Sequence, residues 1–307
     1  MENFLTVASQ VGSIFILMIV GYICGKANLL KENAIKSLSN LVLYVATPMA
    51  ILQAFVKEEK TAEKSLNLLW LFLISAGIQI LSILIAKLTV KNKDKSAEDI
   101  LRFCVVFSNC GYMAFPLQKA LLGEIGVFYG AMYVVTFNTL LWTYGAYSLS
   151  KDKGFLSFKK IVTCPAIIAT VFSVLLYIFE LKLPNIIGNA VTHLGNLNTP
   201  IPMIIVGYYL SCTSIKSAFT DKRCYVPIVS RLVFVPIIAF IIMYILGIRG
   251  IPLTANVIAA SAPSAAVSTL FATKFRLDYS AAVNMITVTN ILSIITMPLF
   301  VMLTQAI

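Results

Sequence analysis

The chain has 307 residues, of which 59% are hydrophobic and only 12% charged, and its formal net charge is +11. A typical soluble domain is roughly half apolar and about a quarter charged, so this composition excludes a soluble globule, a disordered chain and a disulfide scaffold. It predicts an all-α polytopic protein embedded in a lipid bilayer. The lysines and arginines lie in short connectors between apolar runs, without interleaved aromatic residues, so we expect no nucleic-acid partner.

Ten segments are long and apolar enough to cross a membrane, which takes about 20 predominantly apolar residues. The first follows an acidic residue and no basic stretch, which is typical of a first span and not of a cleaved signal peptide. In chain order we expect spans at residues 4–24, 34–56, 66–86, 100–122, 125–150, 161–179, 186–212, 225–246, 252–273 and 279–305.

The distribution of basic residues predicts the orientation of these spans. With the N-terminus outside, the cytoplasmic connectors carry 17 of the 24 lysines and arginines and the outer connectors carry 6. Connectors rich in Lys and Arg stay in the cytoplasm. We therefore expect a multi-pass protein of the cell membrane with both termini extracytoplasmic.

An internal repeat divides the chain into two halves, residues 1–150 and 151–307. Thr47 and the following proline recur 152 residues later as Thr199 and its proline, and Asn138 recurs at the same offset as Asn290. Each half contains five expected spans. Because five is an odd number, the second half enters the membrane upside down relative to the first, which is an inverted repeat of the kind found in secondary transporters.

The fourth and ninth spans contain residues that interrupt helices. Asn109, Gly111 and Pro116 lie near the middle of the fourth span, and Pro263 lies in the ninth span between Ser261 and Ser264. Paired interruptions at corresponding positions indicate a transporter binding site, where two half-helix N-termini favour an anion. The alternative is two kinked helices that pack through small residues.

Other polar residues within spans have two possible roles. Thr47 with Pro48, and Asn198 ahead of Pro200, mark either simple kinks or true breaks of the second and seventh spans. Asn138 and Asn290 fit either helix packing or the lining of a site. Arg231 fits either a functional charge or a side chain that reaches the interface, and His193 fits an interfacial or hydrogen-bonded residue better than a proton carrier.

The acidic residues exclude one class of transporter. All thirteen Asp and Glu residues fall in connectors or at span ends, whereas a cation/proton exchanger needs a carboxylate within the membrane. The sequence also contains no motif of a metalloenzyme, a nucleotide-binding loop or a dinucleotide site, so we expect no enzyme activity, no metal and no cofactor. These features favour an organic anion as the transported partner.

Three motifs resemble the auxin efflux carrier family, which includes the plant PIN-type exporters and bacterial malate and malonate permeases. They are SNCGYMAFPL in the fourth span, LVLYVATPMAIL in the second, and ASAPSAAVSTLFATKFRLDYSAAVNMITVTNILSIITMP across the ninth and tenth. The resemblance covers nearly the whole chain. The short middle connector, KDKGFLSFKK, is similar to that of short prokaryotic members.

The resemblance implies the fold of bile-acid symporters and sodium/proton antiporters, with the broken fourth and ninth spans crossing. Spans 1, 2, 6 and 7 would form a scaffold and a homodimer interface, and spans 3–5 and 8–10 a transport domain that slides past it like an elevator. The family's substrate-binding asparagine corresponds to Asn109. Phe115 stands where the family often has a small residue, which leaves the size of the substrate open.

We therefore expect a secondary transporter for a small carboxylate such as malate, malonate or an auxin-like acid. Asn109, Tyr112 and the backbone at Gly111 would hold the carboxylate from one side, Ser261 and Ser264 would hold it from the other, and Thr47 and Asn198 would line the scaffold wall. The alternatives are a sodium-coupled organic-anion symporter of the bile-acid type and a membrane sensor that does not transport.

Overall fold

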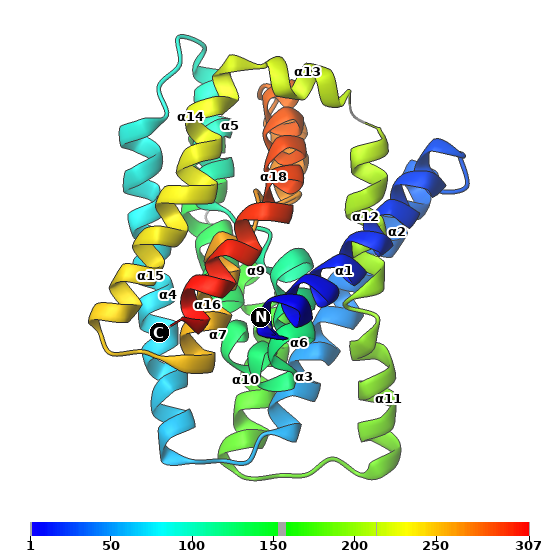
Figure 1. The fold of residues 1–307 in the computed structure, drawn as a ribbon, viewed down its shortest axis with the longest axis vertical. Coiled ribbons are helices and arrows are strands. Elements are labelled where there is room, and N and C mark those ends of the chain that lie inside the picture. Colours follow the sequence, from blue (N-terminus) through cyan, green and yellow to red (C-terminus); the bar gives the residue numbers. More distant parts are fainter. Residues whose placement is uncertain (1, 153–157, 213, 307) are drawn as a thin grey trace.

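The computed structural model describes residues 2–152, 158–212 and 214–306, and this part of the chain is almost entirely helical (Figure 1). Residues 153–157 of the expected middle connector lie outside the described residues. The helices are α1 (Glu2–Lys26), α2 (Glu32–Leu41), α3 (Thr47–Lys57), α4 (Ala62–Thr89), α5 (Lys95–Val106), α6 (Phe115–Leu122), α7 (Glu124–Leu140), α8 (Ala146–Ser150), α9 (Phe158–Val162), α10 (Pro165–Ile178), α11 (Asn185–Asn196), α12 (Pro200–Ser211), α13 (Ile215–Thr220), α14 (Tyr225–Val229), α15 (Val235–Ile245), α16 (Gly250–Ser261), α17 (Val267–Lys274) and α18 (Tyr279–Gln305).

Five helical segments of the described chain are long and apolar enough to cross a membrane. Three more are apolar but shorter, at Gly12–Lys26, Pro165–Ile178 and Gly250–Ser261. Many large apolar side chains on these helices are exposed, which is the pattern of helices that face lipid. The chain is therefore a multi-pass membrane protein.

Several helices begin at a side chain that caps the first turn. Asp94 ahead of α5 accepts a hydrogen bond from the backbone of Ser96, and Thr61 ahead of α4 accepts one from Lys64. Asp278 does the same for Ala281 at the start of α18. Each cap satisfies one of the N–H groups that a helix start leaves unpaired.

Three prolines within the expected spans each follow a π-helical turn. Such turns at Val42–Ala46, Cys110–Ala114 and Ser230–Phe234 are each followed, two residues on, by a proline at position 48, 116 or 236. Proline has no N–H to donate and its ring clashes with the preceding turn, so the wider turn absorbs the mismatch without ending the helix. A fourth π-helical turn, Leu141–Gly145, joins α7 to α8.

Within the described residues, three of the expected spans are interrupted near their middle. The fourth span is interrupted between α5 and the π-helical turn that precedes α6, and the ninth between α16 and α17. The seventh is interrupted between α11 and α12, ahead of Pro200, whereas the second continues through its π-helical turn past Pro48. The Thr-Pro site at residue 47 therefore lies within a continuous helical segment, whereas the site at residue 199 lies at a break.

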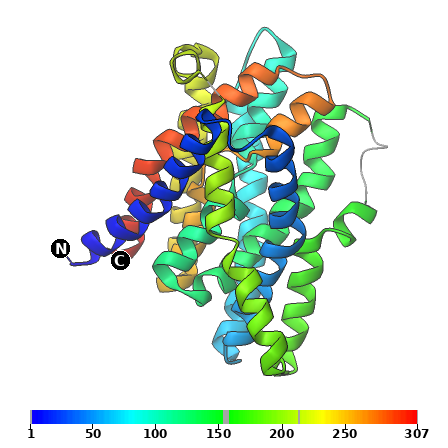
Figure 2. The ribbon, with the colours of Figure 1, turned by 90° about the vertical axis from the view of Figure 1, so that its right-hand side faces the viewer.

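Helices α1 and α12 lie side by side and approach closely (Figures 1 and 2). A Cβ atom added to Gly21 would collide with the backbone of Ile204, and one added to Gly207 would collide with the backbone of Met18. Small residues at such contacts let two membrane helices pack backbone against backbone. This close pair joins the first span of the chain to the seventh.

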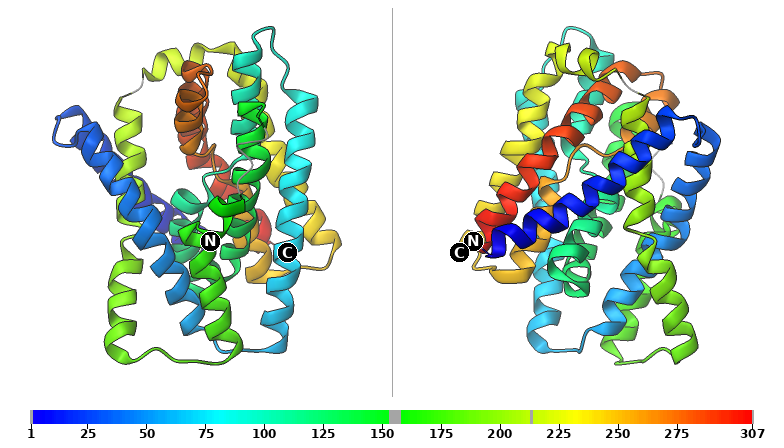
Figure 3. Two further views of the ribbon diagram at one scale, coloured as in Figure 1. Left: turned by 180° about the vertical axis from the view of Figure 1, so that it is seen from behind. Right: turned by 45° about the vertical axis from the view of Figure 1, so that its right-hand side comes forward.

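The two ends of the described chain lie at a similar height in the views of Figures 1, 2 and 3. Helix α13 runs across one end of the molecule and links α12 to the segment that begins at Lys222. The two breaks at the ends of α5 and α16 lie inside the molecule, where the surrounding residues are buried.

Candidate functional site

The two interrupted segments meet at their breaks as a short antiparallel pair. Ser108 forms an isolated β-bridge with Ser264. The N–H of Asn109 donates to the carbonyl of Pro263 at 2.7 Å, and the N–H of Ala265 donates to the carbonyl of Phe107 at 2.9 Å. The extended residues of the first half therefore pair with those of the second, and four half-helices (α5, α6, α16 and α17) converge on one place.

Arg231 binds the C-terminal ends of two of these half-helices. Its side chain, from the π-helical turn Ser230–Phe234, is completely buried. The guanidinium donates to the carbonyls of Val105 (2.9 Å) and Val106 (3.4 Å) in α5, and to that of Ala260 in α16. The last carbonyls of a helix have no partner within it, so Arg231 satisfies acceptors that would otherwise be unpaired in the membrane.

Ser264 joins the second break to α5 and α18. Its hydroxyl donates to the carbonyl of Cys104 at 2.9 Å, and its N–H donates to the hydroxyl of Thr289 on α18 at 3.2 Å. The hydroxyl of Ser261 donates within its own helix, to the carbonyl of Ile258 at 3.1 Å. The acceptors from Cys104 to Phe107 are thus all used.

Hydrogen-bond donors at the first break are in surplus. The side-chain amide nitrogen of Asn109 is buried and has no hydrogen-bond partner within the protein. Asn109 immediately precedes the π-helical turn Cys110–Ala114. The first N–H groups of a helix have no carbonyl partner within that helix. A Cβ atom on Gly111 would meet no atom within 4 Å beyond its chain neighbours and its own helical turn, so there is open space beside Gly111.

The expected scaffold residues bind each other. Thr47 donates through its hydroxyl to the side-chain oxygen of Asn198 at 2.7 Å, and both side chains are buried. The bond joins the start of α3 to the break between α11 and α12. His193, one turn before that break, is exposed.

The remaining expected residues occupy different surroundings. Tyr112 is half-buried, and its hydroxyl donates to the carbonyl of Ser39 in α2 at 3.2 Å. Pro116 is buried in the first turn of α6. Asn138 and Asn290 each donate to a carbonyl one turn earlier in their own helix, and the side-chain oxygen of Asn290 has no partner within the protein.

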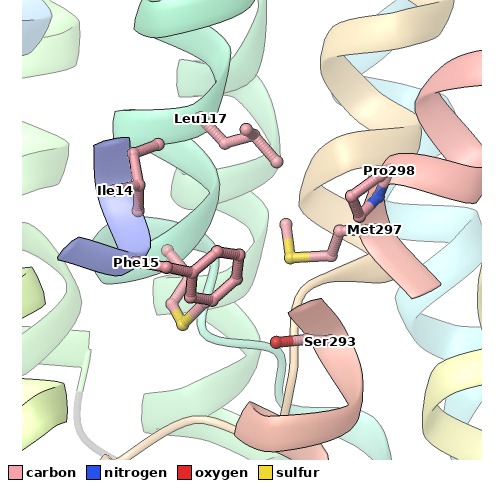
Figure 4. Close-up of a pocket in the computed structure, with 7 residues that line it drawn as sticks. Ile14, Phe15, Leu117, Ser293, Met297 and Pro298 are labelled. Atoms are coloured by element: carbon pink, nitrogen blue, oxygen red, sulfur yellow. The ribbon is translucent and has the colours of Figure 1, made fainter. Parts of the chain in front are cut away.

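A small cavity lies beside α6, between α1 and α18, but it does not match the chemistry of an anion. Figure 4 shows its lining, which is apolar except for one serine: Ile14, Phe15, Met113, Leu117, Ser293, Met297 and Pro298. Its volume of about 10 Å³ is enough for about one water molecule. The donors at Asn109 are therefore the better candidate for a ligand.

The sequence left the role of Arg231 open and gave no role to Ser108 or Thr289. An arginine within an apolar span that has no acid must find carbonyl oxygens, and two helix breaks supply free carbonyls. That reasoning would have paired Arg231 with the breaks. The buried hydroxyl of Ser108, which lacks a partner within the protein, has no comparable signal in the sequence.

Within the described residues, no cluster of three or more His, Cys, Asp or Glu side chains is arranged to hold a metal ion. The six cysteines are free thiols. The chemistry available at the two breaks is therefore that of neutral amides and hydroxyls, backbone N–H groups and one guanidinium.

Comparison with known proteins identifies the family. The family described as membrane transport protein matches residues 6–156 and 154–301. The chain belongs to this family. The match confirms the resemblance to auxin efflux carriers that the three motifs indicated.

The chain is also similar to two archaeal proteins, each named an uncharacterized transporter. One, from Methanocaldococcus jannaschii, is 25% identical over 94% of this chain and 95% of its own. The other, from Methanothermobacter thermautotrophicus, is 26% identical over the same shares.

Proposed function

We propose that this membrane transport protein is a secondary transporter that moves a small organic anion across the cytoplasmic membrane by elevator-type alternating access. The observation that carries the proposal is the imbalance at the crossing of the two broken segments. The carbonyl acceptors there are bound by Arg231, Ser264 and Ala265, whereas the side-chain amide nitrogen of Asn109 has no partner within the protein. A site with spare donors and no carboxylate suits an anion.

The same arrangement argues against a coupling cation at this place. A sodium ion needs several oxygen ligands, and those nearest to the breaks already accept hydrogen bonds from Arg231. The guanidinium is also permanently charged and would repel a cation. The sodium-coupled symporter of the bile-acid type is therefore the second candidate.

The proposed architecture has ten spans arranged as two inverted repeats of residues 1–150 and 151–307. The helical segments follow the expected spans in order, with the interruptions of the fourth and ninth at corresponding positions. We assign the scaffold to spans 1, 2, 6 and 7, in line with the close packing of α1 against α12 and the Thr47–Asn198 bond.

Few polar contacts join the proposed scaffold to the proposed transport domain. Glu124, at the start of α7, accepts hydrogen bonds from Gln53 (2.6 Å) and Lys57 (3.3 Å) of α3. Lys119 of α6 donates to Asn196 of α11 at 2.8 Å. Movement of one domain past the other requires these contacts to break and re-form, so they are expected to differ between the two access states.

Thermal stabilisation of the purified protein by a panel of carboxylates, each with and without sodium, tests this proposal. A ligand at about 100 times its Kd adds about 2.7 kcal/mol of stability. We expect stabilisation by organic anions that is independent of sodium and is lost in Asn109→Ala. The matched control is Asn189→Ala, which removes an amide from an exposed position on α11. Stabilisation by sodium alone would favour the symporter, and binding without counterflow in vesicles would favour a sensor.

A further inference from the structure

Arg231 is a buried cation without a carboxylate partner among the described residues. Among the charged residues that the structure describes, only Arg231 and Glu98 are buried. Glu98 lies near the start of α5 and pairs with Arg102 at 2.8 Å and Lys95 at 3.0 Å. Arg231 donates to the backbone carbonyls of Val105, Val106 and Ala260, and an arginine does not lose its proton in a protein.

The partial charges of the surrounding half-helices can be added to this formal charge. The C-terminal ends of α5 and α16, which Arg231 binds, each carry about half a negative charge. Together they compensate the guanidinium. The N-terminal ends of the helices that follow the two breaks each carry about half a positive charge. No acidic side chain of the described residues is bonded to those ends, so about one positive unit remains uncompensated where Asn109 presents its free amide.

We propose that Arg231 fixes the charge of the transported ligand at one negative unit and makes the loaded carrier electrically neutral. This inference rests on the proposed function and deepens it by naming the substrate class as monovalent carboxylates. Without ligand, the buried part of the moving domain carries the charge of Arg231. With a monoanion it carries none, and with a dianion it carries one negative charge.

The proposal predicts which step of transport responds to the membrane potential. In net transport the unloaded carrier must return with its positive charge, so that step is sensitive to voltage. In exchange of a monoanion for itself, only the neutral loaded carrier crosses, so the rate is independent of voltage. One elementary charge across about 100 mV changes an equilibrium by up to about 50-fold, so the two cases are easily separated.

The experiment measures self-exchange by the full-length protein in liposomes, with the potential clamped at 0 or about −100 mV by a potassium gradient and valinomycin. The labelled ligands are pyruvate and indole-3-acetate as monoanions, and malonate and malate as dianions. Protein-free liposomes correct for passive permeation. We expect faster exchange of the monoanions, at a rate that is the same at both potentials, and a several-fold effect of potential on any dianion exchange.

Variants of Arg231 test whether this residue sets the dependence of exchange on the membrane potential. Arg231→Lys keeps the charge, so monoanion exchange should stay insensitive to potential. Arg231→Gln leaves the loaded carrier with one negative charge, so monoanion exchange should become sensitive to potential by several-fold. Lys222→Gln removes an exposed charge at the first residue of the same helical segment and should change nothing.

Two outcomes separate the inference from the function on which it rests. Dianions exchanged in preference to monoanions, or monoanion exchange by the unsubstituted protein that depends on potential, would overturn the charge assignment and leave a carboxylate carrier. Exchange of none of the four acids would overturn both. If Arg231→Gln fails to fold, the comparison of monoanions with dianions in the unsubstituted protein still decides the question.

Discussion

The break after α5 and the break after α16 lie against each other, yet their polar groups are used in different ways. At the second break, Ser264 binds both α5 and α18 through its hydroxyl and its N–H. At the first break, the amide nitrogen of Asn109 has no partner, and there is open space beside Gly111. Two interruptions at corresponding positions therefore differ in their bonding: hydrogen bonds of Ser264 hold the second to its neighbours, whereas the first retains an unpartnered amide.

Substitution of Asn109 by alanine is expected to have the largest effect on transport. It removes a donor to a charged ligand, which is worth about 1.5–3 kcal/mol, so apparent affinity should fall by roughly 10- to 150-fold. Because that nitrogen has no partner within the protein, the melting temperature should stay close to that of the unsubstituted protein. Carboxylate counterflow and thermal unfolding measure the two quantities on the same preparation. Transport at the unsubstituted rate would remove Asn109 from the site.

Substitution of Ser264 by alanine should show the opposite pattern. The carbonyl of Cys104 then loses its donor in a buried region, which costs about 1–3 kcal/mol of stability. The matched control is Ser293→Ala, because the buried hydroxyl of Ser293 donates only to the carbonyl of Asn290 in its own helix, so its removal should cost less. Thermal unfolding in detergent compares the two variants. Equal melting temperatures for the two variants would show that the hydrogen bond from Ser264 to Cys104 adds no stability at the crossing.

Substitution of Thr47 by valine tests the bonded pair outside the crossing. The hydroxyl of Thr47 donates to Asn198, and loss of one such hydrogen bond costs about 0.5–1.5 kcal/mol. Thr139→Val is the control, because its hydroxyl bonds only to the carbonyl of Val135 in its own helix. A smaller loss of stability in Thr47→Val than in Thr139→Val would contradict a structural role for the pair.

The sequence located the two breaks because proline, glycine and asparagine interrupt helices locally. It did not distinguish the Thr-Pro site at residue 47 from that at residue 199. The first is absorbed by a π-helical turn, whereas the second is followed by another proline, Pro202, so two N–H groups are missing within one turn and the helix ends. Local chemistry explains this difference once the turn is known, but the turn itself depends on packing.

The sequence could have directed Arg231 to the breaks, but not to the particular carbonyls that it binds. Val105 and Val106 are more than 120 positions away from Arg231 in the chain, and Ala260 belongs to a different span. Their carbonyls become available only because both helices end at the same place in space. Side-chain identity does not encode backbone acceptors, so a contact of this kind needs the three-dimensional arrangement.

Substitution of Gly111 by alanine gives the smallest expected effect and the sharpest test of the open space at the first break. The new methyl group would meet no protein atom within 4 Å, and alanine favours a helix over glycine by about 0.5–1 kcal/mol, so the protein should be unchanged or slightly more stable. Gly77→Ala in α4 is a matched control, because a Cβ atom there also meets nothing within 4 Å. If the space beside Asn109 receives the carboxylate, Gly111→Ala should lower counterflow several-fold while Gly77→Ala leaves it unchanged. Equal transport by the two variants would mean that the ligand lies elsewhere, and the unused donors of the first break would then need another explanation.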